Sequence, residues 1–189
     1  DGGVLQWYGN EFAAGIQGLS ATGERRFAAA LDGGFTLAEL GADGRHLALA
    51  PSRGRPEFWR VDGERATREA IEIGDDMHRW KAIAHSNDGS RTRLAATIEA
   101  GDEARVTGFV VWEIAWAAEG EPTTAHLLHE EGALRDVIAE RAGGAVIVVG
   151  EARTDLWQLA SGATDRLPDC VAEVHGFTLA PGRRAVVLV

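Results

Sequence analysis

The stretch Phe109-Val110-Val111-Trp112-Glu113-Ile114 decides the fold, because its pattern of apolar residues followed by a tryptophan returns along the chain. The pattern occurs again as PEFWRV at 56–61, as TDLWQL at 154–159 and, in a shorter form, as VLQW at 4–7. Short runs rich in aliphatic and aromatic residues and bounded by turn residues are typical of β-strands. The recurrence therefore indicates a repeated unit made of strands.

Each of the three longer copies follows a turn and an apolar strand. The turns contain Asp43-Gly44, Asn87-Asp88-Gly89 and Gly143-Gly144, which are residue pairs that favour tight turns. A strand before the turn is repeated letter for letter, since GFTLA occurs at 34–38 and again at 176–180. The unit is thus strand, turn, strand, turn and a strand that contains the tryptophan.

The spacing of the tryptophans gives the length of the unit. It is 53 residues from Trp59 to Trp112 and 45 from Trp112 to Trp157, near the ~40–45 residues of a four-stranded propeller blade. At this point the sequence resembles the WD40-type β-propeller family, whose repeat places a His near the start of a blade and a Trp at the end of the third strand. His78 precedes Trp112 by 34 residues and His129 precedes Trp157 by 28, both within the family's range. The residue after each Trp differs from the Asp that the family favours.

The resemblance implies an all-β protein, a β-propeller of the WD40 type with four to five blades. We expect residues 1–189 to form one such domain or part of one. The resemblance also implies structural roles between blades for the repeated residues, which are Trp7, Trp59, Trp112, Trp157, His78 and His129. Residues 65–73 and 134–141 carry a weak helical pattern, and we assign both to strand or irregular structure.

Two irregularities concern the order of strands. The stretch 35–40 either serves as the third strand of one blade and the first of the next, or one blade is abbreviated. Val4 to Trp7 has the character of a third blade strand, whereas 174–180 and Arg184 to Val189 have that of a first and a second. An open ring exposes unpaired backbone groups. We therefore predict that Arg184 to Val189 pairs with Val4 to Trp7 and closes the ring. In the alternative, the missing strands belong to other residues or to a partner chain.

The composition excludes several classes of protein. With 45% hydrophobic residues among 189, the chain can bury a core, unlike a disordered tail. No apolar run approaches the roughly 20 residues that span a bilayer, so we expect no membrane segment. A formal net charge of −10 argues against a nucleic-acid partner. The opening residues show no basic and apolar signal pattern, and we expect a cytoplasmic protein.

Metal and acid–base chemistry find little support in the sequence. His126 and His129 precede Glu130 and Glu131, a set that zinc accepts. In a strand, however, positions 126 and 129 point to opposite faces, so we favour a structural histidine over a metal site. The acidic turns Asp75-Asp76 and Gly101-Asp102-Glu103 are better explained as solvated loop charge than as a paired-carboxylate site. Calcium at such turns is a minor alternative.

Nucleophilic and phosphate chemistry are equally weak. No serine lies in a Gly-x-Ser-x-Gly elbow. The lone cysteine, Cys170, has acidic neighbours that favour an inert thiol and cannot build a multi-thiolate zinc site. A phosphate-binding loop needs a lysine after its glycine, and Lys81 is the only lysine. We therefore expect no catalytic residues, no cofactor and no enzymatic activity.

The remaining candidates are residues outside the repeat. Trp80, with Arg79 beside it, and Trp116 fall off the tryptophan pattern. Because Trp and Arg are enriched at binding hot spots, these three are the candidate partner-contact residues, although ordinary packing is the stronger explanation for each indole. The sequence thus predicts a non-catalytic protein-interaction scaffold. The alternative is a regulatory or gating propeller module of a larger enzyme, such as a propeller-bearing serine peptidase.

Overall fold

A computed structural model shows an all-β protein built from antiparallel sheets. It describes the chain except residues 1–3, 11–12, 21, 32–33, 42, 101–104, 118–120, 132–133, 141–143, 151–152, 168–176, 180–185 and 189. Within these described residues there is no helix long and apolar enough to cross a membrane.

The strands form five consecutive sheets, each made of strands that follow one another in the chain. Blade A contains β1 (Val4–Asn10), β2 (Ala13–Leu19) and β3 (Arg25–Leu31). Blade B contains β4 (Leu37–Leu40), β5 (His46–Ala50), β6 (Glu57–Asp62) and β7 (Arg65–Arg68). Blade C contains β8 (His78–His85), β9 (Arg91–Ala100), β10 (Arg105–Ala115) and β11 (Thr123–Glu131). Blade D contains β12 (Leu134–Ala139), β13 (Ala145–Gly150), β14 (Thr154–Gln158) and β15 (Ala163–Leu167), and a last pair contains β16 (Phe177–Leu179) and β17 (Val186–Leu188).

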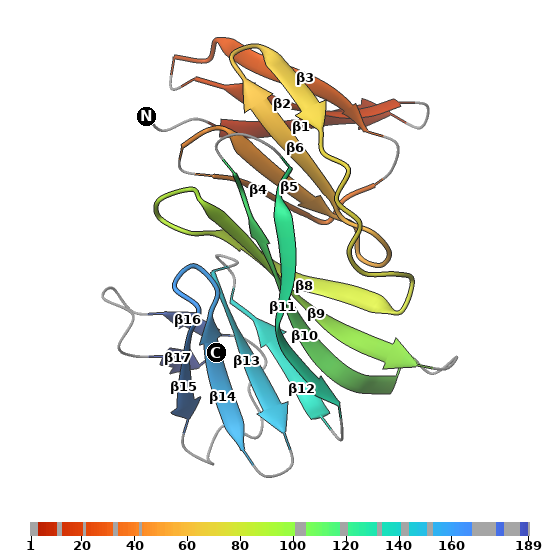
Figure 1. The fold of residues 1–189 in the computed structure, drawn as a ribbon, viewed down its shortest axis with the longest axis vertical. Coiled ribbons are helices and arrows are strands. Elements are labelled where there is room, and N and C mark those ends of the chain that lie inside the picture. Colours follow the sequence, from red (N-terminus) through yellow and green to blue (C-terminus); the bar gives the residue numbers. More distant parts are fainter. Residues whose placement is uncertain are drawn as a thin grey trace.

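The sheets follow one another like the blades of a propeller (Figure 1). The first strands of blades B, C and D lie next to one another, since β4 contacts β8 and β8 contacts β12. These strands form the inner edge of the arrangement, and β7, β11 and β15 form its outer edge. Blade A touches blade B through its last strand, β3, against β7. The predicted all-β propeller is confirmed, and the stretches 65–68 and 134–139 are strands.

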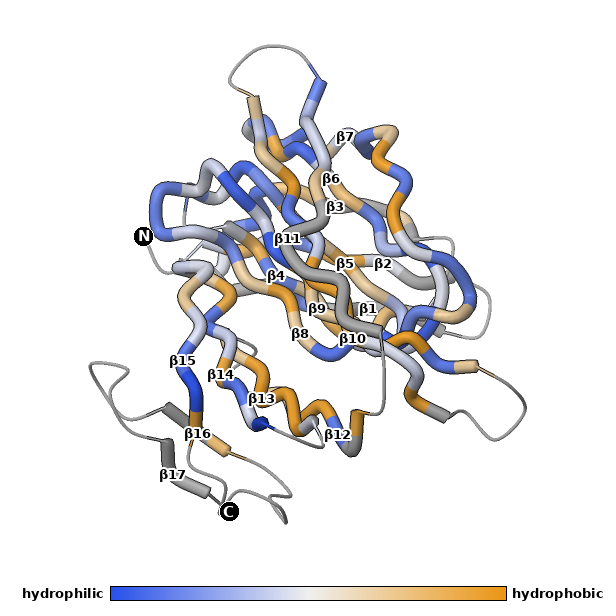
Figure 2. Tube along the Cα trace, turned by 60° about the horizontal axis from the view of Figure 1, so that its bottom comes forward, coloured by the Kyte–Doolittle hydropathy of each residue, from blue (hydrophilic) through white to orange (hydrophobic). Residues whose placement is uncertain are grey.

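The core lies between the faces of neighbouring sheets. In β10, Val110 packs in the cluster shared with blade B, whereas Val111 packs in the cluster shared with blade D. Successive side chains of a strand point to opposite faces, so a sheet covered on both sides must be apolar on both. All five residues of β5 are buried, as are the first five of β13. The apolar colour of β12 and β13 in Figure 2 follows this arrangement.

The repeat is seen in the strand register. Trp59, Trp112 and Trp157 each lie in the third strand of a blade, opposite Leu47, Leu94 and Val146 of the second strand. The repeated stretch GFTLA also recurs in structure, because 34–38 leads into β4 and 176–180 contains β16, the first strand of each sheet. The strand order predicted from the pattern of tryptophans is therefore correct for these three blades.

The predicted closure of the ring is wrong. β17 pairs with β16, whereas β1 pairs with β2, and the two terminal sheets lie at opposite ends of the row (Figure 1). Consequently Trp7 lies in the first strand of blade A and does not share the third-strand position of the other tryptophans. β1 and β2 adjoin in sequence, and pairing such neighbours costs far less chain entropy than pairing the two ends.

The structure also shows to which blade the stretch 35–40 belongs. β4 pairs with β5 and belongs to blade B alone. The alternative in which this stretch serves two blades is therefore wrong, and the sheet before it, blade A, contains three strands among the described residues.

A buried arginine ties blade C to blade D. Arg93 on β9 is 8% exposed, and its guanidinium lies 2.7 Å from the carboxylate of Glu113. The same guanidinium donates to the backbone carbonyls of Leu159 (2.7 Å) and Ala160 (3.0 Å), which follow β14. A second arginine, Arg91, reaches the same carboxylate at 2.8 Å from the surface, with its side chain 51% exposed. The two arginines form a matched pair, one buried and one exposed.

Replacing each arginine by methionine should separate these contributions. Arg93→Met leaves part of a buried carboxylate and the Leu159 carbonyl without a donor, so the free energy of unfolding should fall by about 3 kcal/mol or more. Arg91→Met removes an exposed ion pair and should cost less than about 1 kcal/mol. Urea unfolding followed by circular dichroism measures both. Equal losses for the two variants would show that Arg93 does not tie the blades together.

Candidate functional site

A cleft of about 1060 Å³ opens between blades A and B. It lies where the turns β2–β3, β4–β5 and β6–β7 come together, and we call it the A–B cleft. Its lining comes from residues 18–20, 24–27, 39–41, 43–45 and 61–64. Since the turns belong to two sheets, the cleft exists only when both blades are in place.

The bottom of the A–B cleft is apolar and depends on one glycine. Phe27 and Val61 are buried there, at 2% and 6% exposure. A Cβ on Gly18 would lie 2.3 Å from Cε1 of Phe27, which is a clash. The phenyl ring can therefore lie across β2 only because residue 18 has no side chain.

The walls of the A–B cleft carry different charges. Arg25 and Arg26 line the blade A side together with Glu24. The blade B side is mainly acidic, with Arg45 beside four carboxylates, which belong to Glu39, Asp43, Asp62 and Glu64. Burial raises the pKa of the Glu39 carboxyl above its usual range. In the part of the chain that the structure describes, the guanidinium groups of Arg25, Arg26 and Arg45 form no salt bridge, so they are available to a ligand.

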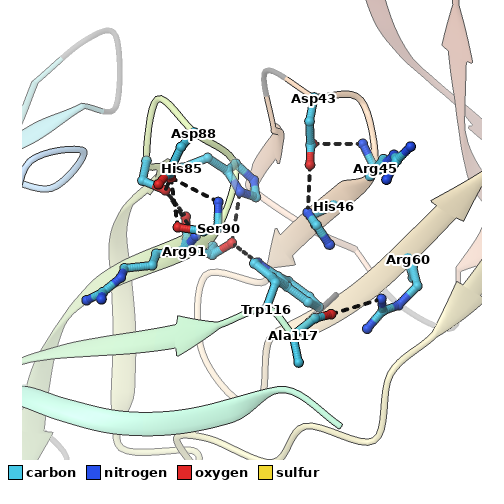
Figure 3. Close-up of polar contacts among 12 residues, drawn as sticks. Asp43, Arg45, His46, Arg60, His85, Asp88, Ser90, Arg91, Trp116 and Ala117 are labelled. Carbon is cyan, nitrogen blue, oxygen red and sulfur yellow. Dashed lines mark hydrogen bonds and ion pairs between the residues drawn. The ribbon is translucent and has the colours of Figure 1, made fainter. Parts of the chain in front are cut away.

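A chain of hydrogen bonds closes the seam between blades B and C just behind this wall (Figure 3). The indole of Trp116 donates to Thr92 Oγ1 at 2.6 Å, and Thr92 Oγ1 lies 2.8 Å from His85 Nδ1. His85 Nε2 lies 3.1 Å from the backbone carbonyl of Glu39 on β4. Because a carbonyl can only accept, Nε2 carries a proton. Burial lowers the pKa of His85 and so favours the neutral ring, in which Nδ1 accepts the hydroxyl hydrogen of Thr92. His85 is thus a neutral imidazole that joins two blades.

A hydroxyl hydrogen-bonded to an imidazole is also the arrangement of a nucleophile and its base. Thr92, however, is 0% exposed, and its oxygen already accepts the indole N–H of Trp116. No substrate atom can reach a fully buried oxygen. The geometry therefore assigns Thr92 and His85 to the seam.

A second imidazole lies in the same seam. His46, at the start of β5, stacks on the indole of Trp116 with ring centres 4.3 Å apart, and its Nδ1 is 3.1 Å from Asp43 Oδ2. Burial lowers the pKa of His46, although the neighbouring Asp43 carboxylate opposes that shift. Arg60 on β6 reaches across the seam to the carbonyl of Ala117 at 3.4 Å. Blade B therefore makes two contacts with the residues that follow β10, through His46 and through Arg60.

The two Asp-Gly turns of blades B and C pack against each other. A Cβ on Gly89 would lie 2.7 Å from Asp43 Oδ2, and the residue has a φ of +70°. Gly44, in the equivalent turn of blade B, has a φ of +68° with no atom within 4 Å of a built Cβ. Both positions favour glycine because of their backbone, but only Gly89 is also needed for close approach to the carboxylate.

Trp80 and Trp116 lie inside the protein, at 4% and 8% exposure. The indole of Trp80 donates to the carbonyl of Gly54 at 2.6 Å, as that of Trp116 does to Thr92. Both indoles are therefore packed inside the protein, which is the explanation favoured for them in the sequence. Arg79 is half exposed and binds Glu99 together with Arg53. A partner contact through these residues stays a prediction, and Arg79 is the one that offers surface for it.

The predicted structural histidines lie in different places. His78 begins β8, where its Nδ1 is 2.7 Å from Asp75 Oδ1. His129 lies in β11, the outer strand of blade C, opposite Val110. The strand register skips Leu127, so His126 pairs with Trp112. The strand register is therefore irregular between the two histidine positions.

The acidic turns are explained by local bonds where the structure describes them. Asp88 accepts hydrogen bonds from Ser86 and Ser90, and these bonds lower its pKa to about 2. Asp75 is bonded to His78 in the same way, which also lowers its pKa. No group of three His, Cys, Asp or Glu residues that could hold a metal occurs among the described residues. Residues 101–103 and Cys170 lie outside them.

The residues of the seam were not singled out from the sequence, Trp116 excepted. His85 and Thr92 stand at the two ends of the turn 86–91 and face each other in the register of β8 and β9. A His and a Thr at such paired positions are a usable signal. The contribution of Glu39 carries no such signal, because it is a backbone carbonyl 46 residues away.

Comparison with known proteins places the fold. No family model and no curated protein matches the sequence. Among solved structures, the acylaminoacyl peptidase of Pyrococcus horikoshii matches with a TM-score of 0.52 and 12% identity, over 94% of this chain and 31% of that one. The β-propeller domain of Cps50 (Swd1) of Myceliophteria thermophila matches with a TM-score of 0.37 and 10% identity, over 88% of this chain and 71% of that one. Hydrazine synthase of Kuenenia stuttgartiensis matches with a TM-score of 0.44 and 12% identity, over 77% of this chain and 46% of that one.

Thr92→Val tests the hydrogen-bond chain. The substitution leaves the buried Trp116 N–H and His85 Nδ1 without partners, so the free energy of unfolding should fall by about 1–3 kcal/mol. Thr107→Val is the control, since the Thr107 hydroxyl makes one bond, to the carbonyl of Ile98, in a half-buried place. Urea unfolding measures both. A loss for Thr92→Val no larger than for Thr107→Val would remove the chain as a stabilising element.

Substituting the two turn glycines by alanine tests the contact between the turns. Gly44→Ala should cost about 1 kcal/mol, the price of a positive φ for an L-residue. Gly89→Ala has nearly the same φ but also pushes Asp43 away, so its loss should be larger by about 1 kcal/mol or more. Thermal and urea unfolding provide the comparison. Equal losses would show that the Asp43 contact is not tight.

Proposed function

We propose that the chain is a non-catalytic protein-interaction scaffold, built on a WD40-like β-propeller, that binds a partner protein in the A–B cleft. The observation that carries the proposal is the cleft itself. At about 1060 Å³, it is as large as the largest common small-molecule pockets, about 300–1,000 Å³. Its rim is charged where such pockets are mostly apolar, and this favours a protein segment over a small molecule.

The charges of the walls suggest the chemistry of that segment. The blade B wall presents the carboxylates of Glu39, Asp62 and Glu64, whereas Arg25 and Arg26 face them from blade A. A partner with basic side chains toward blade B and acidic ones toward blade A would match both walls. Complementary charge of this kind speeds association and excludes wrong partners. The net charge of −10 further favours a partner that is basic overall, and we keep the cytoplasm as the proposed compartment.

Charge reversal in the cleft tests this function. Arg25→Glu and Arg26→Glu each reverse a positive charge on the blade A wall without breaking a described salt bridge, so both variants should fold. Arg166→Glu on β15 is the control, because that residue is exposed far from the cleft in blade D. Proteins that the wild-type chain retains from a cell extract should be lost by the cleft variants and kept by the control. With the purified partner, Kd should rise about tenfold or more, which is about 1.4 kcal/mol.

Two outcomes would contradict the proposal. One is that the wild-type chain retains no specific protein. The other is that cleft variants and control retain the same protein with equal affinity, which would move the binding surface elsewhere.

A second proposal is a regulatory or gating propeller module of a larger enzyme, such as a propeller-bearing serine peptidase. The chain spans 31% of the peptidase whose fold it matches, and a module of that size would leave the catalytic part on other residues. That likeness is one of fold. The open reading frame beside residues 1–189 distinguishes the proposals, since a hydrolase elbow or a nucleotide-hydrolase loop there would favour the enzyme module.

A further inference from the structure

A single imidazole bridges blades B and C directly behind the A–B cleft. His85 bonds blade B through Nε2, which donates to the Glu39 carbonyl at 3.1 Å. It bonds blade C through Nδ1, which accepts from Thr92 at 2.8 Å. Both ring nitrogens are thus engaged, one as a donor and one as an acceptor. Only the neutral ring can accept the hydroxyl hydrogen of Thr92, because a protonated imidazole has two donors and no acceptor.

Protonation of His85 would disturb the hydrogen bonding of the buried Thr92 hydroxyl. A proton on Nδ1 would turn the Thr92 hydroxyl hydrogen away from its acceptor. Thr92 is 0% exposed and its oxygen also receives the Trp116 indole. A buried donor that loses its partner costs far more than an exposed one. Protonation of His85 is therefore unfavourable as long as the seam stays closed.

The charged groups around His85 either lower its pKa, as burial does, or act on that pKa more weakly than burial. Burial lowers the pKa of His85, the hydrogen bond with the Glu39 backbone opposes that shift, His46 lowers the pKa further and Asp43 raises it. Around His46, Arg60 and Arg45 add positive charge, and Asp88 lies on the turn that follows His85 (Figure 3). The closed seam thus holds His85 neutral, whereas a freely solvated imidazole takes up a proton near its ordinary pKa of about 6.5.

The same seam forms part of the wall of the cleft. Glu39, Gly41 and Asp43 line the A–B cleft, and all three contact the seam. Glu39 binds His85, Asp43 packs on Gly89, and a Cβ on Gly41 would lie 3.4 Å from His85 Nδ1. A movement of the β4–β5 turn away from blade C must therefore change the shape of the cleft.

We propose that protonation of His85 releases the β4–β5 turn from blade C and so weakens partner binding in the A–B cleft, an inference that rests on the proposed function of the cleft. The sign follows from linkage. The open seam binds one more proton than the closed seam once the pH is below about 6.5, so acidification favours the open form. Above that pH both forms are neutral at His85, and the seam has its full stability.

Hydrogen exchange of the chain without any partner tests the switch itself. Protection factors, which correct for the intrinsic pH dependence of exchange, are measured by mass spectrometry for peptides covering 37–45 and 86–92. In the wild-type chain they should fall about tenfold between pH 7.5 and pH 5.5, while peptides from blade D keep theirs. His85→Gln, whose amide can still donate to the Glu39 carbonyl, should abolish that dependence on pH.

Two further measurements control the result. His78→Gln, at the other end of β8, should retain the tenfold change. The ring-proton resonance of His85 in the wild-type chain should titrate together with the exchange of 37–45, which requires no variant to fold. A seam whose protection is the same at both pH values, or changes equally in His85→Gln, would overturn the proposal.

The binding arm uses the purified partner found with the wild-type chain. Its Kd should rise about fivefold or more between pH 7.5 and pH 5.5 for the wild-type chain but not for His85→Gln. If exchange changes and binding does not, the seam does not regulate the cleft and the proposal fails. This failure is distinct from a failure of the proposed function, which the arginine variants test at pH 7.5 with His85 intact.

Discussion

Burial of blades B, C and D between neighbouring sheets is the constraint on which the rest of the structure depends. A strand in blade C must be apolar on both faces, and Val110 and Val111 accordingly enter different clusters. Polar side chains that have to lie between blades are thus driven to the ends of the strands. There they can be buried only with partners, and both His85 and Arg93 are found in this situation, bonded across a seam.

One position in the repeat shows how the seams differ. His46, Arg93 and Ala145 occupy the same place in their blades, next to the residue that faces the tryptophan. In blade B the imidazole stacks on Trp116 of blade C. In blade C the guanidinium binds carbonyls of blade D, and in blade D the side chain is a methyl group. A guanidinium stays charged throughout the range in which proteins fold, whereas an imidazole changes charge near neutrality. Of these two seams, the B–C seam is therefore the one suited to respond to pH.

These differences explain what could be predicted from the sequence. The tryptophans at 59, 112 and 157 identified the third strands because each is part of a contiguous strand with a turn nearby, so the pattern is local. Closure of the ring was wrong because the ends of the chain gave no information on competing local pairs, and β1 takes β2 as its neighbour. The seam was missed for a related reason. It joins a backbone carbonyl at Glu39 to side chains of another blade, and no residue type marks a carbonyl that will be used.

The A–B cleft arises from the way blade A meets blade B. Between B, C and D the first strands are neighbours, whereas blade A touches blade B through β3 and β7, at the outer edge. The cluster of Ile16, Phe27, Leu47, Leu49 and Val61 holds the two blades together below the turns. Phe27 lies against Gly18 of β2, and charged residues, among them Arg25, Asp43 and Glu64, line the cleft between the turns. The space between them is left to the charged residues of the rim, which water or a partner must solvate. A binding surface at this place is thus a consequence of packing below it, and its shape depends on the seam that fixes the β4–β5 turn from the other side.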